Sequence, residues 1–226
     1  MKIGIFGTGM VGRALAIGFE ARGDDVTIGT RDVADLMGRT EGDQMGNPPF
    51  AAWHAEHPGI AVGTFEDAAR HGELLVNATL GAASIDALTA AGPDNLSGKI
   101  LIDASNALDH STGFPPALFI GNTDSLGELI QRTFPDVRLV KAWNTVNASL
   151  MTNPGPIGDG DHTLPICGDD DGAKKEVAQI LESFGWQDVL DLGDLTNARA
   201  TEAYITLWIR AFMTLGSPMF NVKFVR

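Results

Sequence analysis

The chain has 226 residues, of which 44% are hydrophobic and 20% charged, so it is an ordinary globular chain with one large domain or one domain and an appendage. Its net charge of −13 argues against nucleic acid and anionic membranes as partners, and any anionic cofactor needs a local positive site. The single cysteine, Cys167, excludes an intrachain disulfide, and the lack of a signal peptide or a bilayer-spanning apolar run predicts a cytoplasmic chain with no membrane part.

Residues 1–31 have the pattern of a strand, a glycine-rich turn, a helix and a second strand. The expected strands cover 2–6 and 25–31, and the expected helix covers 11–22. In such a unit the glycines allow a tight turn, a close approach of backbone to a pyrophosphate and close packing of the helix on the strand. The helix N-terminus adds free N–H groups for phosphates. The unit predicts a dinucleotide site, with the candidate residues Gly7, Thr8, Gly9, Met10, Val11 and Gly12.

The hydrophobic pattern then continues as an alternation of strands and helices. Four more strands are expected over 60–64, 73–79, 99–105 and 137–143, with helical stretches over 32–37, 50–57, 65–72, 82–91 and 125–134 and a loop over 38–49 rich in Gly, Asp, Asn and Pro. Six strands in this alternation predict an α/β fold with a doubly wound parallel sheet, the Rossmann fold. We assign residues 1–150 to this nucleotide-binding domain.

A loop over 147–161, with several Gly and Pro residues, is the best internal boundary. Residues 151–226 are expected to form a small α/β C-terminal extension with two strands, 163–168 and 187–192, and two helices, 170–184 and 197–215. The last helix is apolar on nearly all sides, which favours burial against the sheet, against a partner subunit, or both. We therefore expect this helix to join a homodimer interface.

The end of the second strand indicates which nucleotide is bound. Ligands of an open parallel sheet bind beyond the carboxyl ends of its strands, and an NAD site has a carboxylate at this one to accept from the ribose 2′-hydroxyl. Here the positions are Thr30 and Arg31, which suit a 2′-phosphate because Arg offers bidentate, charge-assisted donors. NADP is therefore favoured over NAD. The alternative is a solvated Arg31, with Asp32 serving the ribose.

Small or polar residues also end the later strands. Ala78, Thr79 and Asn106 are candidates for contacts to the ribose and nicotinamide, although Asn106 could equally be a turn residue. Asn144 either contacts the carboxamide side of the nicotinamide or closes the sheet. The histidines do not have the spacing of a metal site. His110 lies in a loop, where a histidine is usually solvated rather than functional. No metal and no catalytic side chain are predicted.

Several of these segments together resemble the family of coenzyme F420-dependent NADP oxidoreductases. The resemblance implies an NADP(H)-binding Rossmann domain whose C-terminal extension contributes to the acceptor pocket. It implies that Thr8, Thr30 and Arg31 hold phosphates and that Ala142 and Asn144 lie near the nicotinamide. The matching stretches are Gly7–Gly12, Gly29–Arg31, Ser105–Leu108, Val140–Val146, Cys167–Asp169, Phe184–Trp186, Asp191–Gly193 and Leu207–Arg210.

The reaction that the resemblance implies is hydride transfer between the nicotinamide and a flavin or deazaflavin such as F420. Such a transfer depends on stacked rings more than on an acid or base. Two features depart from the family: residues 32–36 are acidic and apolar where a lysine can occur, and the charge of −13 does not attract the polyanionic tail of F420. The alternatives are an NADPH-dependent imine or carbonyl reductase, with His110 as the first candidate proton donor, and a non-catalytic dinucleotide-sensing module.

Overall fold

Six parallel strands form the central sheet, in the order β3-β2-β1-β4-β5-β8. The computed structural model describes residues 1–42, 46–111 and 113–226. The strand order reverses between β1 and β4, which confirms the predicted doubly wound Rossmann fold. The strands are β1 (Lys2–Phe6), β2 (Asp25–Thr30), β3 (Ala61–Thr64), β4 (Leu74–Asn77), β5 (Ile100–Asp103) and β8 (Arg138–Lys141).

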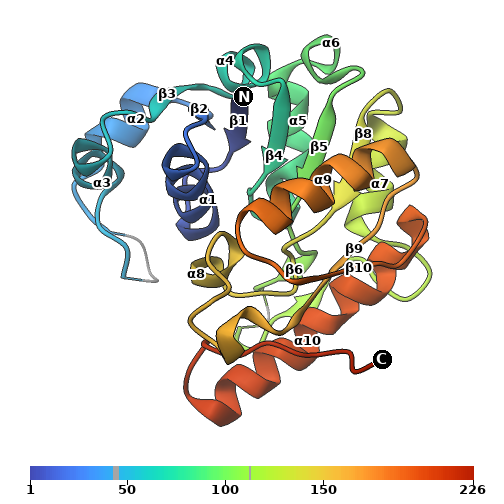
Figure 1. Ribbon diagram of the computed structural model, residues 1–226. Helices are drawn as coiled ribbons and strands as arrows, with labels where there is room; N and C mark the ends of the chain where they lie inside the picture. The colour runs from blue at the N-terminus through green and yellow to red at the C-terminus, as the bar shows by residue number, and fades with distance from the viewer. Residues whose placement is uncertain (43–45, 112) are drawn as a thin grey trace.

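Helices cover both faces of this sheet. Successive side chains of each strand point to opposite faces, and both faces carry apolar side chains that the helices bury. In β5, for example, Ile100 and Ile102 belong to one core and Leu101 to the other. The first core packs against α1, α8 and α9, and the second against α4 to α7 (Figure 1). The helices are α1 (Met10–Ala21), α2 (Val33–Gly38), α3 (Phe50–Glu56), α4 (Phe65–His71), α5 (Ser84–Ala91), α6 (Pro93–Leu96), α7 (Leu126–Thr133), α8 (Ala148–Met151), α9 (Asp171–Ser183) and α10 (Ala198–Leu215).

The C-terminal extension contains the expected two strands and two main helices. Strands β9 (Thr163–Ile166) and β10 (Asp188–Asp191) pair in parallel, and an antiparallel bridge from Cys167 to Lys141 joins them to the edge of the main sheet. The indoles of Trp143 and Trp186, one from each side of the predicted boundary, both donate to the carbonyl of Met151. The first hydrophobic core therefore runs across residue 150. None of the described helices is long and apolar enough to cross a membrane.

Some short elements differ from the sequence prediction. The loop predicted over 147–161 contains α8 and a 3-10 turn, Gly158–Gly160, and a small hairpin of β6 (Leu108–Asp109) and β7 (Ala117–Leu118) was not predicted. These elements have two to four residues, too few to show a hydrophobic period. Residues 43–45 of the predicted 38–49 loop lie outside the described part of the chain.

The last helix, α10, is not buried on all sides by its own chain. Its buried residues lie on one face and include Glu202, Ile205 and Ile209. Leu207 and Met213 are exposed on other faces, so the apolar surface that suggested a partner remains available in the single chain. In Figure 1, α10 crosses the molecule below β9 and β10, near the C-terminus.

Candidate functional site: a dinucleotide cleft and an adjoining cavity

In the glycine-rich turn between β1 and α1, two glycines are required by contacts within the chain and a third, Gly9, is not. Gly7 has a φ of +114°, and a Cβ there would lie 2.5 Å from the carbonyl oxygen of Ala78. A Cβ on Gly12 would lie 1.9 Å from the carbonyl oxygen of Gly7. At Gly9, in contrast, a Cβ would meet nothing within 4 Å. The space beside Gly9 is open to a ligand that approaches the backbone closely, as a pyrophosphate does.

The first turn of α1 is electrostatically suited to such an anion. Gly9 caps the helix without a side-chain hydrogen bond, and the first turn has no acidic residue, so the N–H groups and the positive end of the helix dipole are available. Nε of Arg13 donates to the carbonyl of Thr8 at 2.9 Å, and its guanidinium lies 5.2 Å from the ring centre of Phe50. The turn is therefore a local positive site in an acidic protein, and its shape and charge fit a dinucleotide.

At the end of β2, the structure bears on the choice between Arg31 and Asp32. Arg31 is exposed, directly after Thr30. Asp32 is the N-cap of α2, and its Oδ1 accepts from the backbone N–H of Asp35 at 2.9 Å. Because one oxygen of Asp32 is engaged in this cap, the arrangement favours Arg31 as the group that meets the nucleotide. Direct contact with a 2′-phosphate stays a prediction.

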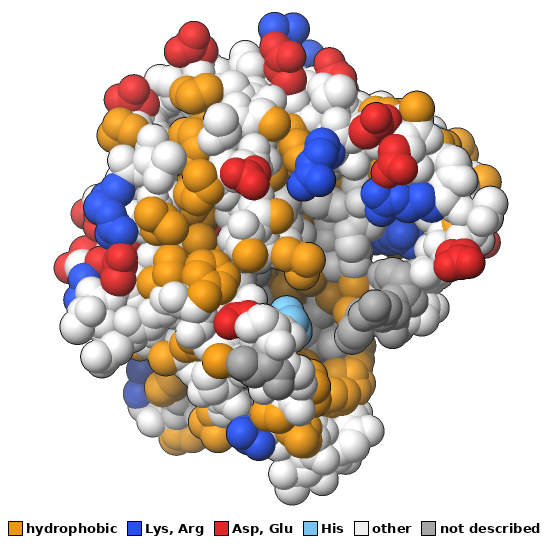
Figure 2. All heavy atoms as spheres, turned by 180° about the vertical axis from the view of Figure 1, so that it is seen from behind, with side chains coloured by type: hydrophobic (Ala, Val, Ile, Leu, Met, Phe, Trp, Pro, Cys, Tyr) orange, Lys and Arg blue, Asp and Glu red, His pale blue; other side chains and the backbone are white. Residues whose placement is uncertain are grey.

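A cavity of about 520 Å³ opens beside the glycine turn, at the carboxyl ends of β4 and β5. Hydrophobic side chains and a histidine border a hollow on this side of the molecule (Figure 2). Leu80 and Phe119, which are 76% and 41% exposed, belong to its apolar wall. The full lining is Val11, Ala78, Thr79, Leu80, Gly81, Ala82, Ala104, Ser105, Asn106, Leu108, Asp109, His110 and Phe119.

Four of the predicted site residues therefore meet at this cavity, namely Val11, Ala78, Thr79 and Asn106. Ala142 and Asn144 are both buried and are not among the residues that line it. The amide nitrogen of Asn144 donates to Oδ1 of Asn106 at 3.1 Å and to the carbonyl of Thr201, while Asn106 donates back to the carbonyl of Asn144. Asn106 is thus held by Asn144 and is more than a turn residue. A direct contact of either residue with nicotinamide stays a prediction.

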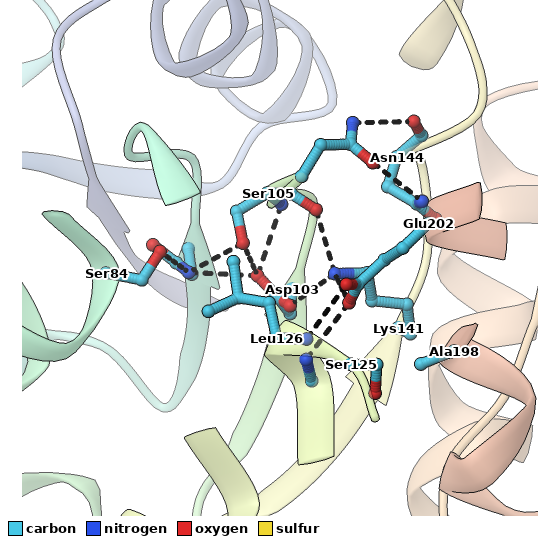
Figure 3. Close-up of polar contacts among 12 residues, drawn as sticks. Ser84, Asp103, Ser105, Ser125, Leu126, Lys141, Asn144, Ala198 and Glu202 are labelled. Carbon is cyan, nitrogen blue, oxygen red and sulfur yellow. Dashed lines mark hydrogen bonds and ion pairs between the residues drawn. The ribbon is translucent and has the colours of Figure 1, made fainter. Parts of the chain in front are cut away.

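Beneath the cavity lies a buried row of polar side chains. Asn77, Asp103 and Lys141 are the last residues of β4, β5 and β8, are paired in register, and are each fully buried. Nζ of Lys141 contacts Oδ2 of Asp103 at 2.7 Å, Oε1 of Glu202 at 2.7 Å and the carbonyl of Ser105 at 2.8 Å. All three ammonium hydrogens are therefore satisfied. Figure 3 shows this lysine between the two carboxylates.

Glu202 reaches this row from α10 and also caps a second helix. Its carboxylate accepts the backbone N–H groups of Leu126 at 2.8 Å and Gly127 at 3.0 Å, which belong to the first turn of α7 (Figure 3). A carboxylate at a helix N-terminus satisfies free N–H groups and complements the helix dipole. One side chain thus connects the C-terminal helix, α7 and the edge of the sheet.

The lysine stays charged in this environment. Burial by itself lowers the pKa of Lys141, but the charges of Asp103 and Glu202 outweigh it and hold the pKa above its ordinary value. This arrangement was not predicted from the sequence. Its signal was the presence of Asp103 and Lys141 at the ends of otherwise apolar strands, since charged residues are rarely buried without partners. The partner Glu202 lies too far along the chain to be found by spacing.

The described residues bring together no group of three or more His, Cys, Asp or Glu side chains able to hold a metal ion. The fold, the glycine turn and the adjoining cavity of about 520 Å³ define a Rossmann protein of the dinucleotide-binding class.

Comparison with known proteins agrees with this class and identifies the family. The profile of the family described as coenzyme F420-dependent NADP oxidoreductase matches residues 2–107. The crystal structure of a candidate F420-dependent NADP reductase from Arthrobacter sp. FB24 is 52% identical, covers 100% of both chains and has a TM-score of 0.95. This protein belongs to the family of coenzyme F420-dependent NADP oxidoreductases, and it is an NADP-dependent oxidoreductase.

Two curated relatives are more distant. The F420-dependent NADP reductase of Methanothermobacter marburgensis is 28% identical over 216 residues, which are 92% of this chain and 91% of that protein. The metalloreductase STEAP3 of Rattus norvegicus is 29% identical over 203 residues. The match covers 89% of this chain but 36% of STEAP3, so this chain corresponds to about a third of that longer protein.

Proposed function

We propose that the protein transfers a hydride between NADP(H) and a flavin or deazaflavin that occupies the 520 Å³ cavity. The observation that carries the proposal is the position of this cavity. It adjoins the glycine turn and is bounded mainly by small and apolar side chains, a lining that accommodates a flat ring system. Its ionisable residues are Asp109 and His110.

The roles of the chain's own residues follow from their places. The backbone of Gly7 to Gly12 and the N-terminus of α1 would hold the pyrophosphate, and Thr30 with Arg31 would hold the 2′-phosphate. Ala78, Thr79 and Asn106 would border the nicotinamide end. When bound, NADPH supplies the hydride from its nicotinamide ring.

The cavity wall would contribute by orienting the two rings and excluding water. The hydride would pass directly from the nicotinamide ring to a ring atom of the acceptor. The main task of the protein is therefore to hold the two rings in alignment. Leu80 and Phe119 would cover the acceptor from outside, because both belong to the cavity wall and both are exposed to solvent. This account requires no acid or base in contact with the reacting atoms.

Rapid mixing of the protein and NADPH with F420, FMN and FAD in turn tests the proposal. Acceptor-dependent loss of the near-ultraviolet nicotinamide absorbance, faster than with NADH, is the expected result. Binding of NADPH without turnover of any of these acceptors would refute it. An acceptor without a polyanionic tail that reacts faster than F420 would instead identify the acceptor as another flavin, as the net charge of −13 favours.

A second reaction is favoured by one observation. His110 is exposed and lines the same cavity. It could therefore donate a proton to an imine nitrogen or a carbonyl oxygen as the hydride reaches the adjacent carbon. In that case His110→Gln should abolish turnover of an imine or ketone while leaving NADPH affinity unchanged. Under the flavin proposal, the same substitution should leave acceptor reduction within a few-fold of wild type.

A further inference from the structure

Thr79 is the cavity hydroxyl best placed to meet a ligand. It lines the cavity and is half-buried, whereas Ser105, which also lines it, is 3% exposed. A free hydroxyl can both donate and accept hydrogen bonds, so it selects no particular ligand group. The hydroxyl of Thr79 is not free, because its Oγ1 lies 2.7 Å from Oδ1 of Asn77 and 3.0 Å from Oγ of Ser84. The directions of these two bonds decide what Thr79 offers to a ligand.

The first direction is set by the buried ion pair. Both oxygens of Asp103 act as hydrogen-bond acceptors, because Nζ of Lys141 donates to Oδ2 at 2.7 Å and the backbone N–H of Ser105 donates to Oδ1 at 3.2 Å. Asn77 must therefore turn its amide nitrogen toward Asp103, which it contacts at 2.9 Å. The same nitrogen donates its second hydrogen to Oγ of Ser84 at 3.0 Å. The amide oxygen of Asn77 is left facing Thr79.

The remaining directions follow from counting hydrogens. An amide oxygen carries no hydrogen, so Thr79 donates its only hydroxyl hydrogen to Asn77. Ser84 already accepts from Asn77, and its own hydrogen is the one available for the 3.0 Å contact with Thr79. Oγ1 of Thr79 then has one unused lone pair and no hydrogen to give.

We propose that the Lys141–Asp103 pair, acting through Asn77, makes Thr79 a fixed hydrogen-bond acceptor in the cavity wall, so that the ligand group seated against it is an N–H or O–H donor. Asp103 and Lys141 are positioning residues, because both are fully buried beneath the cavity. The inference rests on the proposed function, in which cofactor and acceptor share this cavity. Two sources carry the required chemistry: the carboxamide N–H of nicotinamide, and an N–H or hydroxyl of the acceptor.

Equilibrium binding of two cofactors to the full chain separates these sources. The 3-acetylpyridine analogue of NADP⁺ keeps the carbonyl but has a methyl group in place of the amide nitrogen. If the donor is the carboxamide, wild type should prefer NADP⁺ about three- to tenfold, the effect of one neutral hydrogen bond. Thr79→Val should remove this preference, and Thr79→Ser should restore it.

Asp103→Asn tests the positioning step, because it keeps the side-chain size and leaves Lys141 paired with Glu202. It frees Asn77 to turn and Thr79 to donate, so the preference for NADP⁺ should fall although Thr79 is still present. If the donor belongs to the acceptor, neither variant changes the cofactor preference. Both should then raise the acceptor KM several-fold at constant kcat.

Three outcomes are decisive against these ideas. Unchanged cofactor preference together with unchanged acceptor KM in Thr79→Val would overturn the inference. So would an Asp103→Asn variant that matches wild type in both measurements while Thr79→Val does not, since the direction would then not be set by Asp103. Failure of wild type to bind NADP⁺ at all would overturn the proposed function and this inference with it, so that titration comes first. Circular dichroism and thermal unfolding of each variant separate these results from misfolding.

Discussion

Replacing Glu202 should destabilise the whole protein, although the residue lies in the last helix. In wild type its carboxylate accepts from Nζ of Lys141 at 2.7 Å and from the backbone N–H groups of Leu126 and Gly127 at 2.8 and 3.0 Å. Glu202→Ala leaves two buried N–H groups without an acceptor and removes one of the two carboxylates that compensate Lys141. No water reaches these groups readily, because Glu202 is 2% exposed and Lys141 is fully buried.

The size of the effect can be worked from these contacts. Each orphaned buried donor costs about 1–3 kcal/mol, and breaking a buried ion pair on one side costs about 3–5 kcal/mol in total. Lys141 keeps Asp103, so we expect the free energy of unfolding to fall by about 3–5 kcal/mol. For a chain of this length, each kcal/mol shifts Tm by roughly 2–4 °C. Glu202→Gln, which keeps one carbonyl acceptor, should lose about half as much.

Urea unfolding followed by tryptophan fluorescence measures this change, with thermal unfolding as a second method. The matched control is Asp35→Asn, which removes an ion pair to Arg39 between side chains that are 59% and 62% exposed. Exposed pairs of this kind contribute little, so the control should unfold with wild type. A Glu202→Ala protein within about 1 kcal/mol of wild type, at an unchanged m-value, would show that this reasoning about the buried row is wrong.

Three further predictions concern the cofactor, the pH dependence and the assembly. Arg31→Ala should weaken NADPH binding about 10- to 100-fold and NADH little, because only NADPH has the 2′-phosphate; equal losses in titration would exclude the assignment. The hydrogen bond from Thr163 and the neighbouring Arg226 and Lys223 hold the pKa of Asp188 at about 2. Ionised Asp188 therefore stabilises the folded state fully above about pH 4, and this contribution is lost as pH falls toward 2. Asp188→Asn should flatten that part of the curve of Tm against pH, and an unchanged slope would contradict it. Light scattering should find a homodimer at micromolar concentration that Leu207→Glu converts to a monomer; a monomeric wild type would contradict the interface.

The sequence predicted the central sheet well because its signals are local. The first strand, the glycine turn and the first helix were placed to within a residue, since a βαβ unit is defined by its own hydrophobic pattern and by glycines at fixed spacing. The same local signals brought four of the predicted site residues together, although their contact with a nucleotide stays a prediction. Val11, Ala78, Thr79 and Asn106 meet at one cavity because strand ends of a parallel sheet meet at one edge.

What the sequence did not predict depends on contacts between distant segments. Strands β6 and β7 have two residues each and exist because they pair with one another. The pairing of Asn106 with Asn144 joins residues 38 positions apart, and Glu202 reaches Leu126 across 76 positions. No hydrophobic period or motif spacing encodes such distances, so these parts of the site could be found only from the folded chain.

The contact between Glu202 and α7 has a consequence for the synthesis of this protein. A nascent chain that has emerged as far as β8 already contains the glycine turn and every residue of the cavity lining. It still lacks the side chain that caps α7 and completes the compensation of Lys141. The buried row of Asn77, Asp103 and Lys141 beneath the cavity therefore gains its last carboxylate partner only after α10 has been synthesised.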